Sequence, residues 1–204
     1  MPAPSMLLVI DSATAACSAA LLEGGEIVDE RHEIVGRGHA ERLVPMIAEL
    51  LDGRRPESIL VDCGPGSFTG VRVGLAAAHG LAIGWQVPLA GYSSLAALAV
   101  AAGQVPVAAA LQGGHGELFV QSYGGDPVAP LDALRSLPPG AAAVSVDALL
   151  VVGSGSEALV ASRGFGTWRD ALPRAADARL LAGPLRSLPA RPIYGRVPDA
   201  KPAP

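Results

Sequence analysis

The sequence predicts an α/β protein that is built from two lobes of related topology. Three observations support this fold class. Residues 7–34 alternate as antiparallel strands, residues 59–84 form a strand, a glycine-rich loop and an apolar helix, and a strand–turn–strand pattern begins again at Val105. The repeat is one of pattern and not of letters. It divides the chain into a first lobe, a smaller second lobe and a proline-rich tail, at residues 1–102, 103–190 and 191–204.

The first lobe should open with three strands. Apolar or alternating runs place them at Leu7–Ile10, Ser18–Leu22 and Glu26–Ile34, with a glycine pair as the turn before the third. From Gly38 to Leu51 the apolar spacing becomes helical, with charged residues on the opposite face. Pro45 should either kink this helix or lie close to its start, because proline removes a helical hydrogen bond.

The middle of the first lobe is organised around one strand, loop and helix. Ile59–Cys63 has the length and β-branched content of a buried strand, and a loop of small residues follows it. The next helix runs to about Gly84, and either Ser67 or Thr69 is a natural N-cap. A short strand at Pro88–Gly91 and a serine-capped helix to about residue 102 complete this lobe.

The helix before Gly84 is apolar nearly all round, and only Arg72 and His79 interrupt it. Such a helix should be buried on more than one side. Each glycine in a helix interior costs about 1 kcal/mol relative to alanine, so glycines at a spacing of four indicate that another backbone comes close. Two interpretations remain open, a helix that meets another subunit and a central helix of one large fold. The glycines are Gly70, Gly74, Gly80 and Gly84.

The second lobe repeats the pattern with shorter elements and a long connection. Residues 124–140, which have prolines and glycines at both ends, are expected to be a loop. Ala175–Leu181 is expected to be a short helix, and a helix to about Ser162 should follow the turn at residues 153–156. Strands are expected at Val105–Leu111, Glu117–Tyr123 and Leu149–Val152.

Composition excludes several classes of protein. Half of the 204 residues are hydrophobic and the mean hydropathy is +0.38, so a core and not disorder is expected. The net charge of −4 argues against nucleic-acid binding by this chain alone. Lys201 is the single lysine, which excludes a P-loop lysine and an internal Schiff base. Without a signal peptide or membrane span, Cys17 and Cys63 are expected to be core residues of a cytoplasmic protein.

Several turns could face an anion. Asp11, Ser12 and Thr14 join two antiparallel strands and read either as a phosphate-facing turn or as an ordinary polar hairpin. The glycines of the central loop do not have Rossmann spacing, which leaves a helix N-terminus able to hold an anion. A metal site and a GxSxG nucleophile elbow are not predicted. The residues expected to face a nucleotide or anion are Asp11, Ser12, Thr14, Ser67, Thr69, Arg72, Gly153, Ser154 and Gly155.

Three runs of the sequence are similar to the TsaB (YeaZ) family. They are LLVIDSATAACSAALL, GHAERLVPMIAELL and GPGSFTGVRVGLAAAHGLAIGWQVPLAGYSSLAALA, within residues 6–102. The resemblance implies the two-lobed actin/Hsp70/sugar-kinase (ASKHA) fold with duplicated mixed sheets. It also implies a non-catalytic subunit without an intrinsic cofactor. Such a subunit pairs with TsaD, which transfers threonylcarbamoyl to tRNA adenosine, and the pair recruits the ATPase TsaE. The isolated subunit forms a homodimer, and ATP or ADP could bind in the complex.

The resemblance also implies which helices form the partner surface. These are the helices that match Gly38–Leu51 and Thr69–Gly84, and Gly74→Arg is expected to abolish pairing while leaving the monomer folded. TsaD carries metal-binding histidines where this chain has Tyr92–Leu95, so the resemblance supports a scaffold and not a catalyst. The expected interface residues are His39, Leu43, Pro45, Met46, Leu50, Gly70, Val71, Gly74, Leu75, Ala78 and His79.

Two departures from the family pattern and two rival functions accompany this resemblance. Gln112–Gly114 stands where relatives often have Asp-x-Arg, and Gly195 replaces an apolar residue. One rival is an ATPase or kinase of the same fold that uses Asp11, Thr14 and the turn at residues 153–156. The other rival is a protease, although the sequence has no metal pair or nucleophile–base spacing that supports it.

Overall fold

The computed structural model describes residues 5–195. The first lobe is built on a five-stranded sheet in the order β3-β2-β1-β4-β5, in which β1, β2 and β3 are antiparallel and β4 and β5 run parallel to β1. The parallel pairs require crossovers, and helices supply them. The elements are β1 (Met6–Asp11), β2 (Ala16–Glu23), β3 (Glu26–Ile34), α1 (His39–Leu51), β4 (Ser58–Asp62), α2 (Phe68–Trp85), β5 (Leu89–Tyr92) and α3 (Ser94–Ala101).

The second lobe repeats this plan. Its sheet has the order β11-β10-β6-β7-β8, so β6, β7, β10 and β11 correspond to β1, β2, β4 and β5. The repeat that the sequence pattern predicts from Val105 onward is therefore confirmed. The elements are β6 (Val107–Gln112), η1 (Gly114–Gly116), β7 (Leu118–Gly124), β8 (Ala129–Pro130), β9 (Arg135–Leu137), α4 (Pro139–Ser145), β10 (Leu150–Val152), α5 (Ser156–Arg163), β11 (Thr167–Arg169), η2 (Ala175–Leu180) and η3 (Gly183–Arg186).

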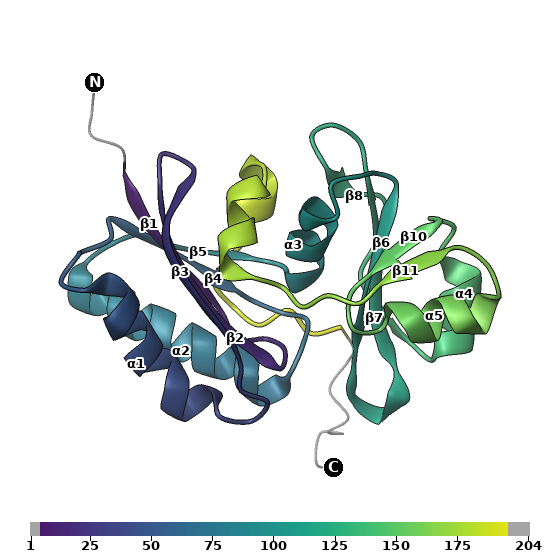
Figure 1. The fold of residues 1–204 in the computed structure, drawn as a ribbon, viewed down its shortest axis with the longest axis horizontal. Coiled ribbons are helices and arrows are strands. Elements are labelled where there is room, and N and C mark those ends of the chain that lie inside the picture. The colour runs from purple at the N-terminus through teal and green to yellow at the C-terminus, as the bar shows by residue number, and fades with distance from the viewer. Residues whose placement is uncertain (1–4, 196–204) are drawn as a thin grey trace, which may run out of the picture.

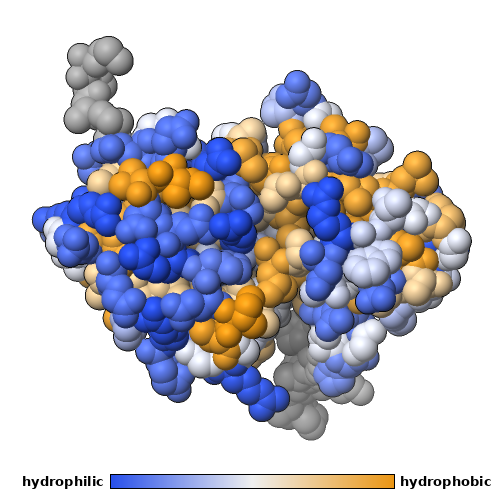
Figure 2. All heavy atoms as spheres, in the orientation of Figure 1, coloured by the Kyte–Doolittle hydropathy of each residue, from blue (hydrophilic) through white to orange (hydrophobic). Residues whose placement is uncertain are grey.

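The two sheets face each other across a central layer of helices (Figure 1). The helices α1 and α2 cover the outer face of the first sheet, and α4 and α5 cover the outer face of the second. Between the sheets lie α3 and η2, whose apolar residues join both inner faces in one core. Figure 2 shows apolar residues along the border between the lobes. No helix in the described range is long and apolar enough to cross a membrane.

The end of the chain returns to the first lobe. Leu188 pairs with Gly91 beside β5, and the amide of Ile193 donates to the carbonyl of Cys63 at 2.8 Å. His79 on α2 contacts the carbonyl of Ala190 through Nε2 at 2.9 Å. We call residues 187–195 the return strap. The single lysine and the part of the proline-rich tail at residues 196–204 lie outside the described residues.

Three parts of the structure differ from the sequence-based prediction. The predicted loop over residues 124–140 is wrong, because β8 and β9 pair with β7 there and α4 begins at Pro139. The strand β11 was not predicted, and its three exposed residues carry no apolar alternation to reveal it. Pro45 is the seventh residue of α1 rather than its start.

Candidate functional site

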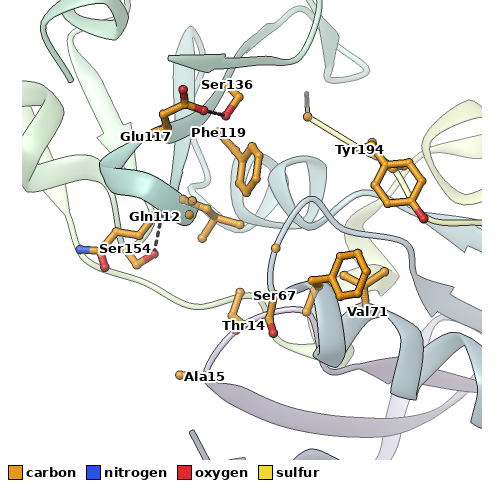
Figure 3. Close-up of a pocket in the computed structure, with 18 of the residues that line it drawn as sticks. Thr14, Ala15, Ser67, Val71, Gln112, Glu117, Phe119, Ser136, Ser154 and Tyr194 are labelled. Carbon is orange, nitrogen blue, oxygen red and sulfur yellow. Dashed lines mark hydrogen bonds between the residues drawn. The ribbon is translucent and has the colours of Figure 1, made fainter. Parts of the chain in front are cut away.

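A cavity of about 570 Å³ lies between the two lobes. Its walls come from the turn after β1, the start of α2, the turn after β6 and the return strap. Figure 3 shows Thr14 and Ser67 on the side of the first lobe, and Gln112, Phe119 and Ser154 on the side of the second. The cavity therefore lies where the equivalent ends of the two duplicated sheets meet.

The lining of the cavity combines hydroxyl groups with aromatic and aliphatic side chains. Ser154 Oγ accepts from the amide of Gln112 at 3.2 Å, and Ser136 donates to Glu117 at 2.6 Å. Phe119 and Tyr194 form part of the apolar wall (Figure 3). Hydroxyl donors beside flat apolar surface suit a small ligand that has both a polar end and a ring.

The return strap and Phe119 explain one departure from the family pattern. Gly195 lies so close to the Phe119 ring that a Cβ at position 195 would come within 2.4 Å of its Cδ1 atom. No side chain fits there without displacing the ring, so glycine at position 195 is matched to the phenylalanine at position 119.

Two buried carboxyl groups lie at the ends of β1 and β4, behind the cavity wall. Asp11 accepts from the hydroxyl of Tyr92 at 2.9 Å, and Asp62 accepts from Ser94 at 2.7 Å and from the amide of Gly64 at 2.7 Å. Burial raises the pKa of both carboxyl groups, and the charge of Asp11 raises the pKa of Asp62 further. Burial and the neighbouring carboxylate thus favour the protonated form of Asp62, which can donate to Asp11.

The carboxyl pair holds the turns that form the cavity and does not enter the cavity itself. Asp11 accepts from the amide of Ala13, and Asp62 binds the loop before α2 through Gly64. Neither carboxyl lines the cavity. Asp62, Tyr92 and Ser94 were not predicted as site residues. A signal in the sequence could have found Asp62, because it ends a strand that runs parallel to β1, which ends in Asp11. The carboxyl ends of parallel strands meet at one edge of a sheet, so the two acidic residues could be expected to lie close together.

The structure separates the residues that were expected to face a nucleotide or anion. Four line the cavity, namely Thr14, Ser67, Arg72 and Ser154. Thr69 is exposed but does not line it. The remaining four are buried and do not line the cavity, namely Asp11, Ser12, Gly153 and Gly155.

The start of α2 is capped by Ser67 and not by Thr69. The Ser67 hydroxyl accepts from the amide of Gly70 at 3.2 Å. The amides of Phe68 and Thr69 occupy the first helical turn, where no intrahelical acceptor is available. This end of α2 therefore presents N–H groups beside the cavity.

Nine of the eleven residues expected at the partner interface are buried in the isolated chain, and their role at an interface stays a prediction. They are buried in this chain's own core, between the first sheet and the two helices that cover it. Pro45 and His79 are exposed. The nine buried residues are His39, Leu43, Met46, Leu50, Gly70, Val71, Gly74, Leu75 and Ala78.

The glycine spacing in α2 reflects two different contacts. At Gly70 a Cβ would lie 2.1 Å from the carbonyl oxygen of Ser12, so this glycine admits the backbone after β1. At Gly80 and Gly84 the same position has nothing within 4 Å. The first pair of glycines, Gly70 and Gly74, therefore serves the fold of one chain, and the second pair is open to solvent.

The exposed face of α1 and α2 forms a patch of apolar and small residues. Ile83 is 77% exposed and Val44 is 58% exposed, on helices that contact each other. We call this patch the outer helical face, which consists of Val44, Pro45, Ala48, Ala76, Gly80, Ile83 and Gly84.

Comparison with known proteins places the chain in a family. Residues 26–155 match the family model described as TsaD: tRNA N6-adenosine threonylcarbamoyltransferase. The chain is 37% identical over 126 residues to the tRNA threonylcarbamoyladenosine biosynthesis protein TsaB of Escherichia coli (strain K12), covering 57% of this chain and 54% of that protein. The chain is 44% identical over 101 residues to the Haemophilus influenzae protein of the same name, and this match covers 47% of this chain and 42% of that protein. The chain thus spans about half the length of the curated relatives it matches.

Solved structures extend the similarity to the whole described fold. A Pseudomonas aeruginosa protein "with similarity to peptidase YEAZ" is 32% identical, covers 94% of this chain and all of its own, and has a TM-score of 0.82. The structure titled "YeaZ from Pseudomonas aeruginosa" gives a TM-score of 0.80 at 32% identity, covering 93% of this chain and 99% of its own. EutJ of Carboxydothermus hydrogenoformans, 16% identical with a TM-score of 0.53, covers 89% of this chain and 91% of its own and shares the fold alone. The duplicated sheets confirm the expected ASKHA architecture, and the chain belongs to the TsaB (YeaZ) family.

Proposed function

We propose that this protein is a non-catalytic subunit of the machinery that makes threonylcarbamoyladenosine in tRNA. Its role is to pair with a TsaD-like partner and to support the transfer reaction of that partner. The names of the curated relatives and the matching family model favour this pathway. The proposed place of action is the cytoplasm, and tRNA is engaged as part of the complex.

The observation that carries the pairing role is the outer helical face. Gly80 and Gly84 each lower helix propensity by about 1 kcal/mol relative to alanine, and no atom of residues 5–195 fills the space above them. The loss of helix stability at these two glycines would be offset if another helix packed closely over α2. Val44 and Ile83 are exposed on the same two helices, and together with these glycines they offer a surface to a partner helix pair or, in the isolated protein, to a second copy.

The acids near the cavity favour a scaffold over a catalyst. Asp11 is buried and hydrogen-bonded to Tyr92, so it does not reach a ligand in the cavity. In the described residues no group of three histidine, cysteine or acidic side chains is placed to hold a metal ion. Both cysteine thiols are buried, and burial raises the pKa of Cys17 to about 11 and that of Cys63 to about 12, which makes them poor nucleophiles. These features also weigh against the protease.

A reconstituted assay tests the proposal. Threonylcarbamoyl transfer to tRNA is measured with the cognate TsaD, TsaE and a supply of threonylcarbamoyl-adenylate, with and without this chain. Transfer should depend on the chain and should fall in proportion to TsaD pairing when the outer helical face is altered. Transfer that is unchanged by omission of the chain would refute the proposed role.

A second candidate function rests on the cavity between the lobes. Its volume lies within the range of small-molecule sites, and hydroxyl groups from both lobes line it. This candidate is a nucleotide-binding ATPase or kinase of the same fold. Calorimetric titration of the isolated chain with ATP and with ADP distinguishes the two functions. Micromolar binding with turnover would favour the enzyme, whereas binding that appears only in the complex would favour the subunit.

A further inference from the structure

Three side chains form a stacked ladder at the rim of the cavity. The Arg72 guanidinium carbon lies 3.3 Å from the centroid of the Phe68 ring and 5.5 Å from that of Tyr194. Arg72 also donates to the carbonyl of Phe68 at 2.9 Å and to the hydroxyl of Tyr194 at 2.7 Å. The guanidinium is therefore fixed in one plane, and the ladder joins the first turn of α2 to the return strap.

The ladder is exposed, although its aromatic rings are large. Phe68 is 69% exposed and Tyr194 is 57% exposed, and both line the cavity. Because Arg72 covers one face of Phe68, the exposed fraction of that ring is available for a further stacking contact. Exposed aromatic rings stacked with arginine planes are the usual platform for unpaired bases.

We propose that the ladder of Phe68, Arg72 and Tyr194 stacks one nucleobase, with the attached phosphate directed toward the start of α2. The first-turn amides and the Ser67–Thr69 segment offer N–H and hydroxyl donors on that side. Two kinds of ligand carry such a nucleobase, a free nucleotide and an unpaired base in a loop of RNA. The RNA source rests on the proposed function, and the free nucleotide does not.

The local charge supports this ligand despite the acidic chain. Arg37 follows Gly36 and Arg191 precedes Pro192, two residues that line the cavity, and both arginines are exposed. Arg72 itself lines the cavity and puts one guanidinium at its rim. Such a rim attracts a phosphate locally, while the net charge of −4 prevents broad binding to nucleic acid. We therefore expect this chain to contact a single base and a partner protein to supply the remaining contacts with the nucleic acid.

The ladder is separate from the outer helical face. Phe68 begins α2, and Ile83 lies fifteen residues further along the helix, which corresponds to about 22 Å at the rise of an α-helix. A substitution at one end can therefore test base stacking without removing the other surface. Phe68 is largely exposed, so truncating its ring removes little of the core.

A fluorescence titration tests the proposal with two probes. One is 2-aminopurine ribonucleoside monophosphate, and the other is a short single-stranded RNA that carries 2-aminopurine at one central position. Stacking on an aromatic ring quenches this fluorophore. The variants are Phe68→Ala, Tyr194→Ala and Arg72→Gln, and the matched control is Ile83→Asp on the outer helical face. Far-ultraviolet circular dichroism establishes that each variant is folded.

We expect saturable quenching by the wild-type protein and by Ile83→Asp, with affinity about tenfold weaker in Phe68→Ala. Quenching of both probes assigns the site to nucleotides in general, and quenching of the RNA alone assigns it to unpaired bases. Absence of quenching by either probe, or equal affinity of folded Phe68→Ala and wild type, would overturn the proposal. Failure here leaves TsaD pairing and transfer unaffected, so it is distinguishable from failure of the proposed function.

Discussion

Gly74 lies against the hydroxyl of Ser12, and a Cβ at position 74 would come within 2.5 Å of that Oγ atom. The Ser12 hydroxyl is itself fixed, because it donates to the carbonyl of Gly70 at 2.9 Å. This contact joins α2 to the end of β1 inside one chain. The earlier expectation that Gly74→Arg leaves the monomer folded is therefore wrong.

Gly74→Ala should lower the free energy of unfolding by about 1–3 kcal/mol, since the added methyl overpacks a filled space. Gly80→Ala is the matched control on the same helix, where nothing lies within 4 Å of the added atom. The control should raise stability by up to about 1 kcal/mol. Urea denaturation followed by circular dichroism measures both. Equal effects of the two substitutions would contradict the assignment of the two glycine pairs.

Ile83→Asp and Val44→Asp should weaken pairing with TsaD at least tenfold without changing the unfolding midpoint. The physical reason is that each places a charge in an apolar contact, which must be desolvated on association. Leu131→Asp is the control, because this leucine is 63% exposed on the other lobe. Co-purification and sedimentation measure pairing. If Ile83→Asp pairs like the control, the outer helical face is not the interface.

Asp62→Asn should flatten the dependence of stability on pH. The folded-state pKa of Asp62 is raised by burial, so the folded protein holds a proton that the unfolded chain releases above about pH 4. The contribution of Asp62 to the free energy of unfolding is therefore largest below that pH. It decreases by up to about 1.4 kcal/mol per pH unit as the pH rises toward the folded-state pKa.

The asparagine amide can replace the proton that Asp62 donates to Asp11, and its oxygen can accept from Ser94. The variant should therefore stay folded and be favoured over wild type as pH rises. Denaturation series at several pH values measure the difference. Parallel curves for the two proteins would show that Asp62 is ionised in the fold, contrary to the shared-proton pair.

Ser67→Ala should cost about 1 kcal/mol of stability, because it removes the acceptor for the amide of Gly70 at the start of α2. Ser67→Asp is the control, since a carboxylate keeps the cap and interacts favourably with the helix N-terminus. Thermal unfolding of the two variants measures the effect. A loss that is equal in both would point to the cavity wall rather than to capping.

Periodicity alone determined the main elements of the first lobe. The strand at Glu26–Ile34 was placed at its observed limits, and α2 was placed within one residue at each end. The alternation of β3 and the apolar run of α2 are long enough to reveal their periods. The repeat from Val105 could also be predicted, since the same strand–turn–strand order builds both sheets.

Four residues that the sequence marks as anion-facing, Thr14, Ser67, Arg72 and Ser154, line the cavity, although the sequence does not predict the cavity itself. Spacing could not tell which glycines of α2 face the sheet and which face solvent. It also could not find the return strap, whose contacts with α2 join residues more than one hundred positions apart.

Only the tertiary structure decided the roles of Asp62 and Tyr194. Asp62 ends a strand with an ordinary apolar pattern, and its partners Asp11 and Ser94 are each about thirty or more residues away. Tyr194 reaches Arg72 only because the return strap crosses the first lobe. Local periodicity is enough to predict the repeating fold, whereas the burial of the carboxyl pair and the stacked ladder depend on long-range packing that no local pattern encodes.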